Sequence, residues 1–160
     1  MKILVLSDTH MPRSAQDLPQ AVYDRIGDVD MIIHAGDLAE KEVLDKLQSL
    51  RPTTAVCGNM DSMRLRSALK EKEVIEIEGV KIGLVHGHGA PMNLVETVKK
   101  EFKGVDAIIF GHSHKPMNEV KNGILFFNPG SPTDTVFAPY RSYGILEVTK
   151  GNIRGEIIKI

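Results

Sequence analysis

The feature that most constrains this chain is a set of short apolar runs, each ending in or followed by glycine, aspartate, asparagine or histidine. The runs are Lys2–Ser7, Met31–His34, Thr53–Cys57, Val80–His86 and Asp106–Phe110. Apolar runs of this length, with little polar alternation, are typical of strands that are covered on both faces. Parallel strands place their carboxyl ends at one edge of a sheet, where the ligands of α/β proteins bind. We therefore expect the polar residues that follow the runs to gather at one edge.

Helical and hairpin patterns fill the rest of the chain. Apolar residues at helical spacing predict helices over Pro19–Ile26, Glu40–Leu50 and Pro91–Phe102. Asp17 is placed to cap the first of these helices. Runs joined by short polar turns predict hairpins that pair Val74–Ile77 with Val80–His86, Pro116–Lys121 with Ile124–Phe127, and Ser142–Thr149 with Ile153–Ile160. The polar segment Arg64–Lys72 fits either a short helix or a loop.

These patterns predict an α/β fold in which helices flank two packed, mixed β-sheets. With 160 residues and no linker or repeat, the chain is expected to form a single domain over residues 1–160.

The net charge of −1 gives no electrostatic argument for a nucleic-acid surface or an anionic membrane surface. No apolar stretch nears the roughly 20 residues that span a bilayer. Cys57 is the only cysteine, which excludes an internal disulfide and a thiolate zinc site, and we expect a cytoplasmic protein.

Seven side chains at the ends of the runs can bind a metal ion. They are Asp8, His10, Asp37, Asn59, His86, His112 and His114. All six histidines of the chain lie in or beside these motifs, which is not the distribution of residues placed for packing or solubility. The oxygen and imidazole nitrogen ligands suit divalent manganese, iron, zinc, cobalt or nickel. So many ligands exceed the needs of one tetrahedral ion, but they fit two ions about 3.5–4 Å apart that share a carboxylate.

The spacing within Gly111–His114 points the same way. In an extended chain, histidines two residues apart project to the same side, with Cα atoms about 6–7 Å apart. This spacing suits two neighbouring ions better than one. Taken alone, the segment also fits a polar loop that happens to contain two histidines, and the other motifs decide in favour of metal.

The order of the motifs resembles that of the calcineurin-like metallophosphoesterases, whose signature is Asp-x-His, Gly-Asp, Gly-Asn, His and Gly-His-x-His. The sequence supplies these parts as Asp8-Thr9-His10, Gly36-Asp37, Gly58-Asn59, His86 and Gly111-His112-Ser113-His114. The chain length and the segment Asn128–Ser131 are similar to those of the small single-domain phosphodiesterase branch. The retromer scaffold subunit also resembles that branch. The family fold, a β-sandwich flanked by helices, agrees with the fold expected above.

The resemblance implies a binuclear metal centre, with Mn²⁺ as the first expectation and Ni²⁺, Fe²⁺, Zn²⁺ or Co²⁺ as alternatives. In this scheme Asp8, His10 and His114 hold one ion, Asn59, His86 and His112 hold the other, and Asp37 bridges the two. A hydroxide that bridges the ions would attack the phosphorus of a phosphodiester in line. Asn59 would help to neutralise charge on the phosphate oxygens.

One position departs from the family pattern. Many members carry histidine after Gly-Asn, where it is thought to protonate the leaving group, but this chain has Met60. Loss of a general acid typically costs about 10²–10⁴-fold in rate, which favours substrates with good leaving groups. The small branch is similar in lacking this histidine and is associated with phosphodiesters, so the resemblance implies a small phosphodiester substrate rather than a protein side chain. His88, two residues after His86, could act as the proton donor or contact the phosphate instead.

A second function class fits the same fold: a non-catalytic metal-binding scaffold that acts through a protein surface, like the retromer subunit. The intact ligand set favours the enzyme, because a scaffold is free to lose such residues.

The oligomeric state is left open, with a homo-oligomer as one option. His34 is expected to pack or to support the site rather than to bind metal. We expect Phe126, Phe127 and Phe137 in the core or at an interface.

Overall fold

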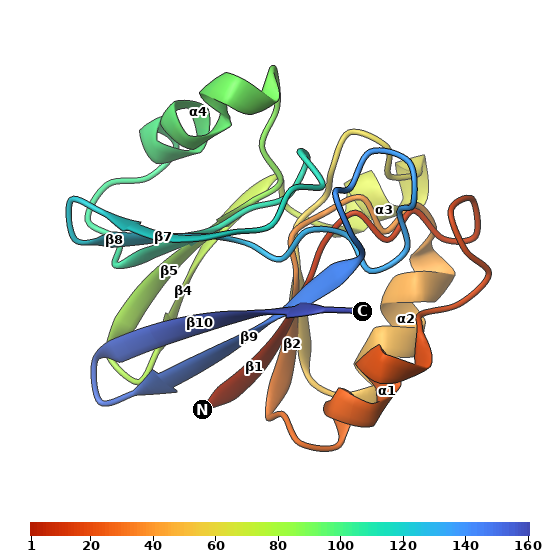
Figure 1. Cartoon of the computed structure of the whole chain (residues 1–160), viewed down its shortest axis with the longest axis horizontal. Helices are drawn as coiled ribbons and strands as arrows, with labels where there is room; N and C mark the ends of the chain where they lie inside the picture. Colours follow the sequence, from red (N-terminus) through yellow and green to blue (C-terminus); the bar gives the residue numbers. More distant parts are fainter.

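Two five-stranded β-sheets form the centre of the computed structural model, which describes residues 1–160 (Figure 1). The first sheet has the order β10-β9-β1-β2-β3, with β1 at Lys2–Leu6, β2 at Met31–His34, β3 at Thr53–Ala55, β9 at Ser142–Thr149 and β10 at Asn152–Lys159. The second has the order β4-β5-β6-β8-β7, with β4 at Lys72–Ile77, β5 at Val80–Val85, β6 at Ala107–Ile109, β7 at Met117–Lys121 and β8 at Ile124–Asn128.

Both sheets combine parallel and antiparallel pairs. In the first sheet β1, β2 and β3 are parallel, whereas β9 pairs with β1 and β10 in the antiparallel sense. In the second sheet β5, β6 and β8 are parallel, and the edge strands β4 and β7 are antiparallel to their neighbours. The expectation of two packed, mixed sheets is therefore confirmed.

Helices cover the outer faces of the sheets. They are α1 at Gln20–Ile26, α2 at Lys41–Leu50, α3 at Met63–Ala68 and α4 at Leu94–Lys100, with a 3₁₀ turn, η1, at Pro91–Asn93. Figure 1 shows α1 and α2 beside the sheet that contains β1 and β2, and α4 beside the sheet that contains β5 and β8. The layers therefore follow the order helix, sheet, sheet, helix. No helix is both long enough and apolar enough to cross a membrane.

The alternation of side chains along β1 explains why both faces of this strand are apolar. Ile3 and Val5 belong to the core cluster that fills the space between the two sheets. Leu4 and Leu6 belong to the cluster that packs the first sheet against α1 and α2. Successive strand residues point to opposite faces, so a strand buried on both sides reads as one continuous apolar run. A third cluster, which includes Phe126, packs α4 against the second sheet.

The carboxyl ends of the parallel strands meet at one edge of the molecule. The amide of Asp8, after β1, donates to the carbonyl of Gly36, after β2, at 3.0 Å. The amide of Gly111, after β6, donates to the carbonyl of His86, after β5, also at 3.0 Å. The amide of His112 then donates to the carboxylate of Asp8 at 3.0 Å and links the two sheets.

The structure differs from the sequence prediction at several element ends. Asp17 does not cap α1: the residue before the helix is Pro19, which makes no side-chain cap, and the Asp17 carboxylate instead pairs with Lys46 at 2.7 Å. The predicted helix from Pro91 is split into η1 and α4, since α4 begins only at Leu94. The undecided polar segment contains most of α3 and ends at the first residue of β4, Lys72.

Candidate metal centre

Asp8 lies at the centre of the site and is fully buried. One carboxylate oxygen, Oδ2, accepts hydrogen bonds from Ser7 Oγ at 2.6 Å and from the amide of His112 at 3.0 Å. The other oxygen, Oδ1, has no hydrogen-bond partner. A buried carboxylate oxygen without a donor is costly, so this atom is suited to a cation.

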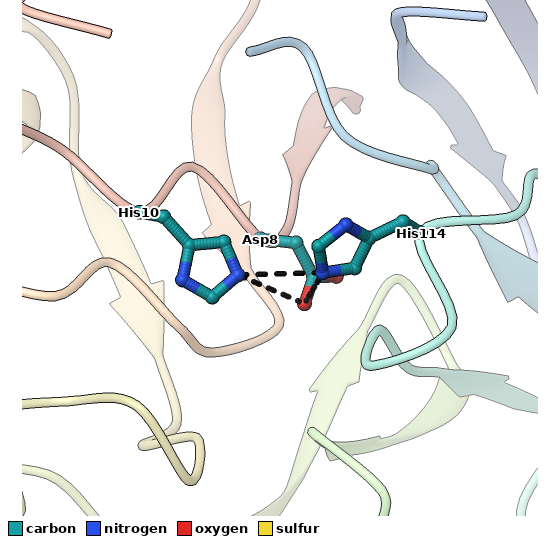
Figure 2. A group of neighbouring side chains, drawn as sticks. All are labelled: Asp8, His10 and His114. Carbon is teal, nitrogen blue, oxygen red and sulfur yellow. Dashed lines mark hydrogen bonds and ion pairs between the residues drawn. The ribbon is translucent and has the colours of Figure 1, made fainter. Parts of the chain in front are cut away.

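Three histidine nitrogens face the unpaired oxygen of Asp8. The Nε2 atoms of His114, His10 and His86 lie 3.3, 3.8 and 3.8 Å from it. His10 comes from the loop after β1, and His114 comes from the loop after β6 on the other sheet, yet their Nε2 atoms are only 3.3 Å apart (Figure 2). The two rings therefore converge on one small space beside the carboxylate.

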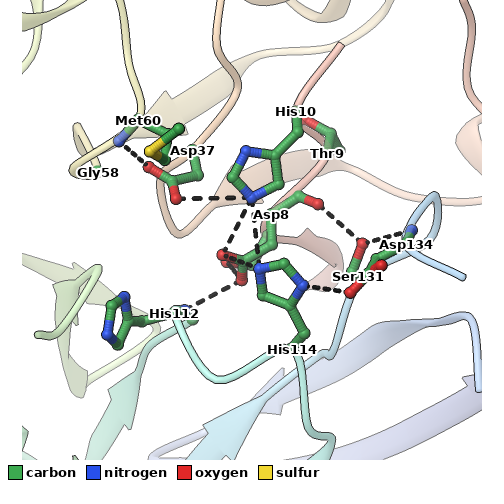
Figure 3. Close-up of polar contacts among 12 residues, drawn as sticks. Asp8, Thr9, His10, Asp37, Gly58, Met60, His112, His114, Ser131 and Asp134 are labelled. Carbon is green, nitrogen blue, oxygen red and sulfur yellow. Dashed lines mark hydrogen bonds and ion pairs between the residues drawn. The ribbon is translucent and has the colours of Figure 1, made fainter. Parts of the chain in front are cut away.

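Asp37 supplies a second carboxylate to the same space. Its Oδ1 accepts a hydrogen bond from the amide of Met60 at 2.7 Å. Its Oδ2 lies 3.2 Å from Nε2 of His86. The same oxygen lies 3.6 Å from Nε2 of His10, a contact that Figure 3 shows. Asp37 thus lies between two histidines that the sequence analysis assigned to different ions.

These ligand atoms form two overlapping groups. One group is Asp8, His10 and His114, the other is Asp8, Asp37 and His86, and the ligand atoms of each lie within 4.8 Å of one another. Oxygen and imidazole nitrogen are the donors that divalent transition ions accept. The residues present therefore fit divalent ions of this class, and Asp8 is common to both groups.

Outer hydrogen bonds orient two of the rings toward this space. The Nδ1–H of His86 donates to the carbonyl of Ala35 at 2.7 Å, and the Nδ1–H of His114 donates to Asp134 Oδ2 at 2.5 Å. Each ring therefore presents Nε2 to the centre, and Nε2 of His86 is buried with no hydrogen-bond partner. Fixing the tautomer through the other ring nitrogen is how proteins orient histidine ligands.

The charges of the site shift the pKa values of its members in opposite directions. Burial disfavours the charged form of His86, but its contact with Asp37 and the negative charge of Asp8 outweigh burial and raise the pKa to about 9. His114 behaves in the same way through Asp8 and Asp134, with a pKa of about 9. The pKa of Asp8 is lowered, because its contacts with His114 and His86 outweigh its burial. The carboxylates of the site thus stabilise the protonated, positively charged form of both histidines.

The backbone of the site is strained. Five of the candidate ligands adopt positive φ angles: Asp8 (54°), His10 (43°), Asp37 (58°), His112 (70°) and His114 (56°). Left-handed φ is uncommon for residues other than glycine, and each such residue costs roughly 1–3 kcal/mol when the surroundings enforce it. Strain of this kind, clustered in one place, is typical of functional sites.

Three predicted site residues lie outside the two groups. Asn59 is exposed and makes no side-chain hydrogen bond, although it lines the same cavity as Asp37. Nε2 of His112 donates to the carbonyl of Gly89 at 3.0 Å, and Figure 3 shows its ring turned away from Asp8. His88 is exposed and lines a different, neighbouring cavity.

Three carboxylates or hydroxyls outside the predicted ligand set support the site. Asp134, which the sequence analysis missed, binds His114 as described above. Ser131 Oγ donates to the carbonyl of Asp8 at 2.8 Å. Asp61 accepts from the amides of Gly58, Ala39 and Asp37 at 2.7, 2.8 and 3.1 Å, and so joins the loops after β2 and β3. The sequence signal for Asp134 was weak: an aspartate shortly after the Asn128–Ser131 segment, with no metal motif around it.

His34 is buried and lies apart from the candidate ligands. Its Nε2 lies 3.1 Å from Thr9 Oγ1, and its Nδ1 has no partner. Burial lowers its pKa to about 3, although the nearby negative charge of Asp8 acts to raise it. It packs in the interior beside Thr9, as expected, and belongs to neither ligand group.

A cavity of about 720 Å³ is lined by five of the seven candidate ligands: His10, Asp37, Asn59, His112 and His114. Its polar part includes His10, Asp37 and His114, and its rim includes Arg13 and Lys115. Pockets of roughly 300–1,000 Å³ hold small organic ligands. The cavity is therefore large enough for a phosphate group and a substituent.

Comparisons with known sequences agree with this site. A family model described as the calcineurin-like phosphoesterase superfamily domain matches residues 1–151. A probable metallophosphoesterase of Methanocaldococcus jannaschii is 45% identical over 138 residues, which cover 83% of this chain and 69% of that protein.

Comparisons with solved structures extend over nearly the whole chain. Vps29 of Entamoeba histolytica, solved in complex with Zn²⁺, is 32% identical with a TM-score of 0.76, and the match covers 99% of each chain. The structure of a novel archaeal phosphodiesterase is 26% identical with a TM-score of 0.75, covering 99% of this chain and 100% of that one. The mixed sheets and flanking helices are thus shared with both proteins.

Proposed function

Because this chain belongs to the calcineurin-like phosphoesterase superfamily, we propose that it is a metal-dependent phosphodiesterase that hydrolyses a small phosphodiester. The observation that carries the proposal is the pair of overlapping ligand groups that share the buried Asp8 and whose members His10, Asp37 and His114 line one cavity. The similarity to an archaeal phosphodiesterase supports a diester rather than another phosphoester.

Two divalent ions are proposed to occupy the site, with Mn²⁺ expected first and Zn²⁺ supported by the zinc complex of Vps29. Asp8, His10 and His114 would hold one ion, Asn59, His86 and His112 would hold the other, and Asp37 would serve both. The geometry raises a second possibility for the bridge, since Asp8 belongs to both ligand groups. Such a pair of ions activates water as a nucleophile at neutral pH and neutralises charge on the phosphate.

The residues of the chain have distinct tasks in this reaction. His86 and His114 present Nε2 because Ala35 and Asp134 hold their other nitrogens. The exposed side chain of Asn59 is free to donate an amide hydrogen to a phosphate oxygen. Electrostatic stabilisation of this type is often the largest single contribution to catalysis.

The absence of a histidine after Asn59 favours diesters with good leaving groups. Met60 is 45% exposed at the cavity and cannot donate a proton. His88 lies in the neighbouring cavity, so a role in protonating the leaving group needs a movement of its loop. We propose that water protonates the leaving group, and we expect faster turnover of an aryl diester than of the matching monoester.

The proposal is tested by hydrolysis of bis(p-nitrophenyl) phosphate in the presence of Mn²⁺. Asp37→Asn keeps the size of the side chain but removes one negative charge from the site, so we expect turnover to fall by at least about 10²-fold. The exposed variant Asp28→Asn is the matched control, and we expect it to retain wild-type turnover. Equal turnover by Asp37→Asn and the wild type would refute the metal-dependent mechanism.

A second candidate function is a scaffold that binds a protein partner, and the full-length similarity to Vps29 supports it. A scaffold would show no diester turnover with any divalent ion, whereas the proposed enzyme would. A cytoplasmic location is also proposed, in keeping with the free cysteine Cys57.

A further inference from the structure

A large aromatic side chain is exposed at the mouth of the candidate metal centre. Phe126 and Phe127 are buried as expected, whereas Phe137 is 74% exposed and the adjacent Val136 is 76% exposed. Phe137 therefore does not belong to the core. A single exposed apolar residue is ordinary on a protein surface. Val136 and Phe137, however, are two adjacent exposed apolar residues, and both are held in place at the site.

The loop that carries Phe137 is fixed by the carboxylate that also orients a candidate ligand. Asp134 accepts hydrogen bonds from the amides of Val136, Phe137 and Ala138 at 2.7, 3.1 and 2.9 Å. The same carboxylate accepts from Nδ1 of His114. The position of the aromatic ring is thus coupled to that of His114, which Figure 3 shows beside Asp134.

The ring of Phe137 faces the site. Its centroid lies 6.1 Å from that of His114, and the two planes meet at 83°. Phe137, Val136, Met60 and Pro91 line the same cavity as His114. The cavity therefore carries both polar groups that would bind a phosphate and apolar side chains, among them an exposed aromatic ring beside His114.

We propose that Phe137 forms the wall of a substrate subsite that binds an aromatic group, an aryl ring or a nucleobase, on the phosphodiester. This inference rests on the proposed phosphodiesterase function. The exposed ring offers a face on which a second ring can stack, and stacking of a base on an aromatic side chain is worth about 1–3 kcal/mol. Arg13 and Lys115 at the rim of the cavity suit the anionic phosphate that carries the ring.

The subsite is tested by calorimetry on the Mn²⁺-loaded protein, with phenylphosphonate and methylphosphonate as probes. Both probes offer the same phosphonate group, so the ratio of their affinities isolates the contribution of the ring. We expect the wild type to prefer phenylphosphonate by about 5-fold or more, and Phe137→Ala to remove most of this preference. Phe137→Trp, which keeps an aromatic face, should retain the preference.

Val120→Ala is the control, since Val120 is 69% exposed on β7 and does not line the cavity. This variant should keep the wild-type preference. An equal affinity of the wild type for both probes, or an unchanged preference in Phe137→Ala, would overturn the aromatic subsite while leaving the proposed function intact.

Turnover of bis(p-nitrophenyl) phosphate separates the two proposals. For Phe137→Ala we expect KM to rise more than kcat falls, because the ring contributes to binding rather than to the chemical step. Failure of the wild type to hydrolyse any diester would overturn the proposed function, and with it the substrate role of this subsite.

Discussion

At the residue scale, the candidate site combines features that are costly to folding. Asp8 and His86 each bury a polar atom without a partner, and five candidate ligands adopt left-handed φ angles. Neither feature helps the chain to fold. Both are explained if a pair of cations completes the site, because cations would satisfy the unpaired atoms and favour the strained arrangement.

Asp134 offers a test of this interpretation at a single residue. The Asp134→Asn variant weakens the acceptor that holds Nδ1 of His114, so Nε2 is less firmly presented to the centre. Loss of such an outer partner typically lowers metal affinity about 10–100-fold. We expect a weaker Mn²⁺ affinity in this range, measured by calorimetry. Asp28→Asn should bind Mn²⁺ as the wild type does, and equal affinity of all three proteins would show that Asp134 does not position His114.

At the scale of elements, the site depends on how closely the loops after neighbouring strands approach. The loop after β3 lies so close to the loop after β2 that a Cβ atom on Gly58 would meet Asp37 Oδ1 at 2.1 Å. Asp61 joins the same two loops through backbone amides. The glycine of the Gly-Asn motif is thus required by a contact between elements.

Gly58→Ala should therefore damage the site and also lower stability, because the added Cβ atom would meet the backbone nitrogen of Asp37 at 2.6 Å as well. The added methyl group displaces the Asp37 carboxylate, and misplacement of a catalytic group by about 1 Å can cost about 10²-fold in rate. We expect a loss of that size in the hydrolysis of bis(p-nitrophenyl) phosphate. Gly27→Ala, where a Cβ atom meets nothing within 4 Å, is the matched control. Similar activity of the two variants would contradict the close packing of these loops.

At the scale of the whole molecule, two sheets supply one site: the first is built from both ends of the chain and the second from its middle. His10 and Asp37 follow strands of the first sheet, whereas His86 and His114 follow strands of the second. The apolar cluster between the sheets, which includes Val5 and Phe127, holds the two edges in register. Stability and site geometry are therefore linked through the core.

The pH dependence of unfolding is a whole-molecule prediction that centres on His34. Burial lowers its pKa in the folded state from 6.5 to about 3, so the unfolded chain binds a proton that the folded protein does not. Stability of the metal-free protein should fall as pH decreases below 6.5, by up to about 1.4 kcal/mol per pH unit. His86 and His114 affect stability in the opposite sense. Their pKa values are raised to about 9 in the folded state, so the stability that they add is complete below pH 6.5 and is lost as pH rises toward 9.

Urea unfolding of the wild type and of His34→Gln, between pH 5 and 6.5, tests this prediction. Glutamine can still contact Thr9 Oγ1 but does not titrate. The variant should therefore show a flatter dependence of unfolding free energy on pH, whatever its absolute stability. Parallel curves for the two proteins would show that His34 is not the titrating group.

Local sequence patterns correctly predicted most of the strands and the order of the layers. Continuous apolar runs identified strands buried on two faces, and the residues at their ends carried the motifs of the superfamily, because these signals are local. The prediction was wrong where local signals compete: Asp17 was expected to cap α1, yet its carboxylate binds Lys46 from α2.

Which side chains meet, and how they are oriented, became visible in the folded structure alone. It placed Asp8 in both ligand groups, turned Nε2 of His112 toward Gly89, and brought Asp134 and Phe137 to His114 from a loop without a metal motif. These contacts join residues up to 106 positions apart, as between Asp8 and His114. No local pattern encodes such contacts, because they depend on how two separately formed sheets pack against one another.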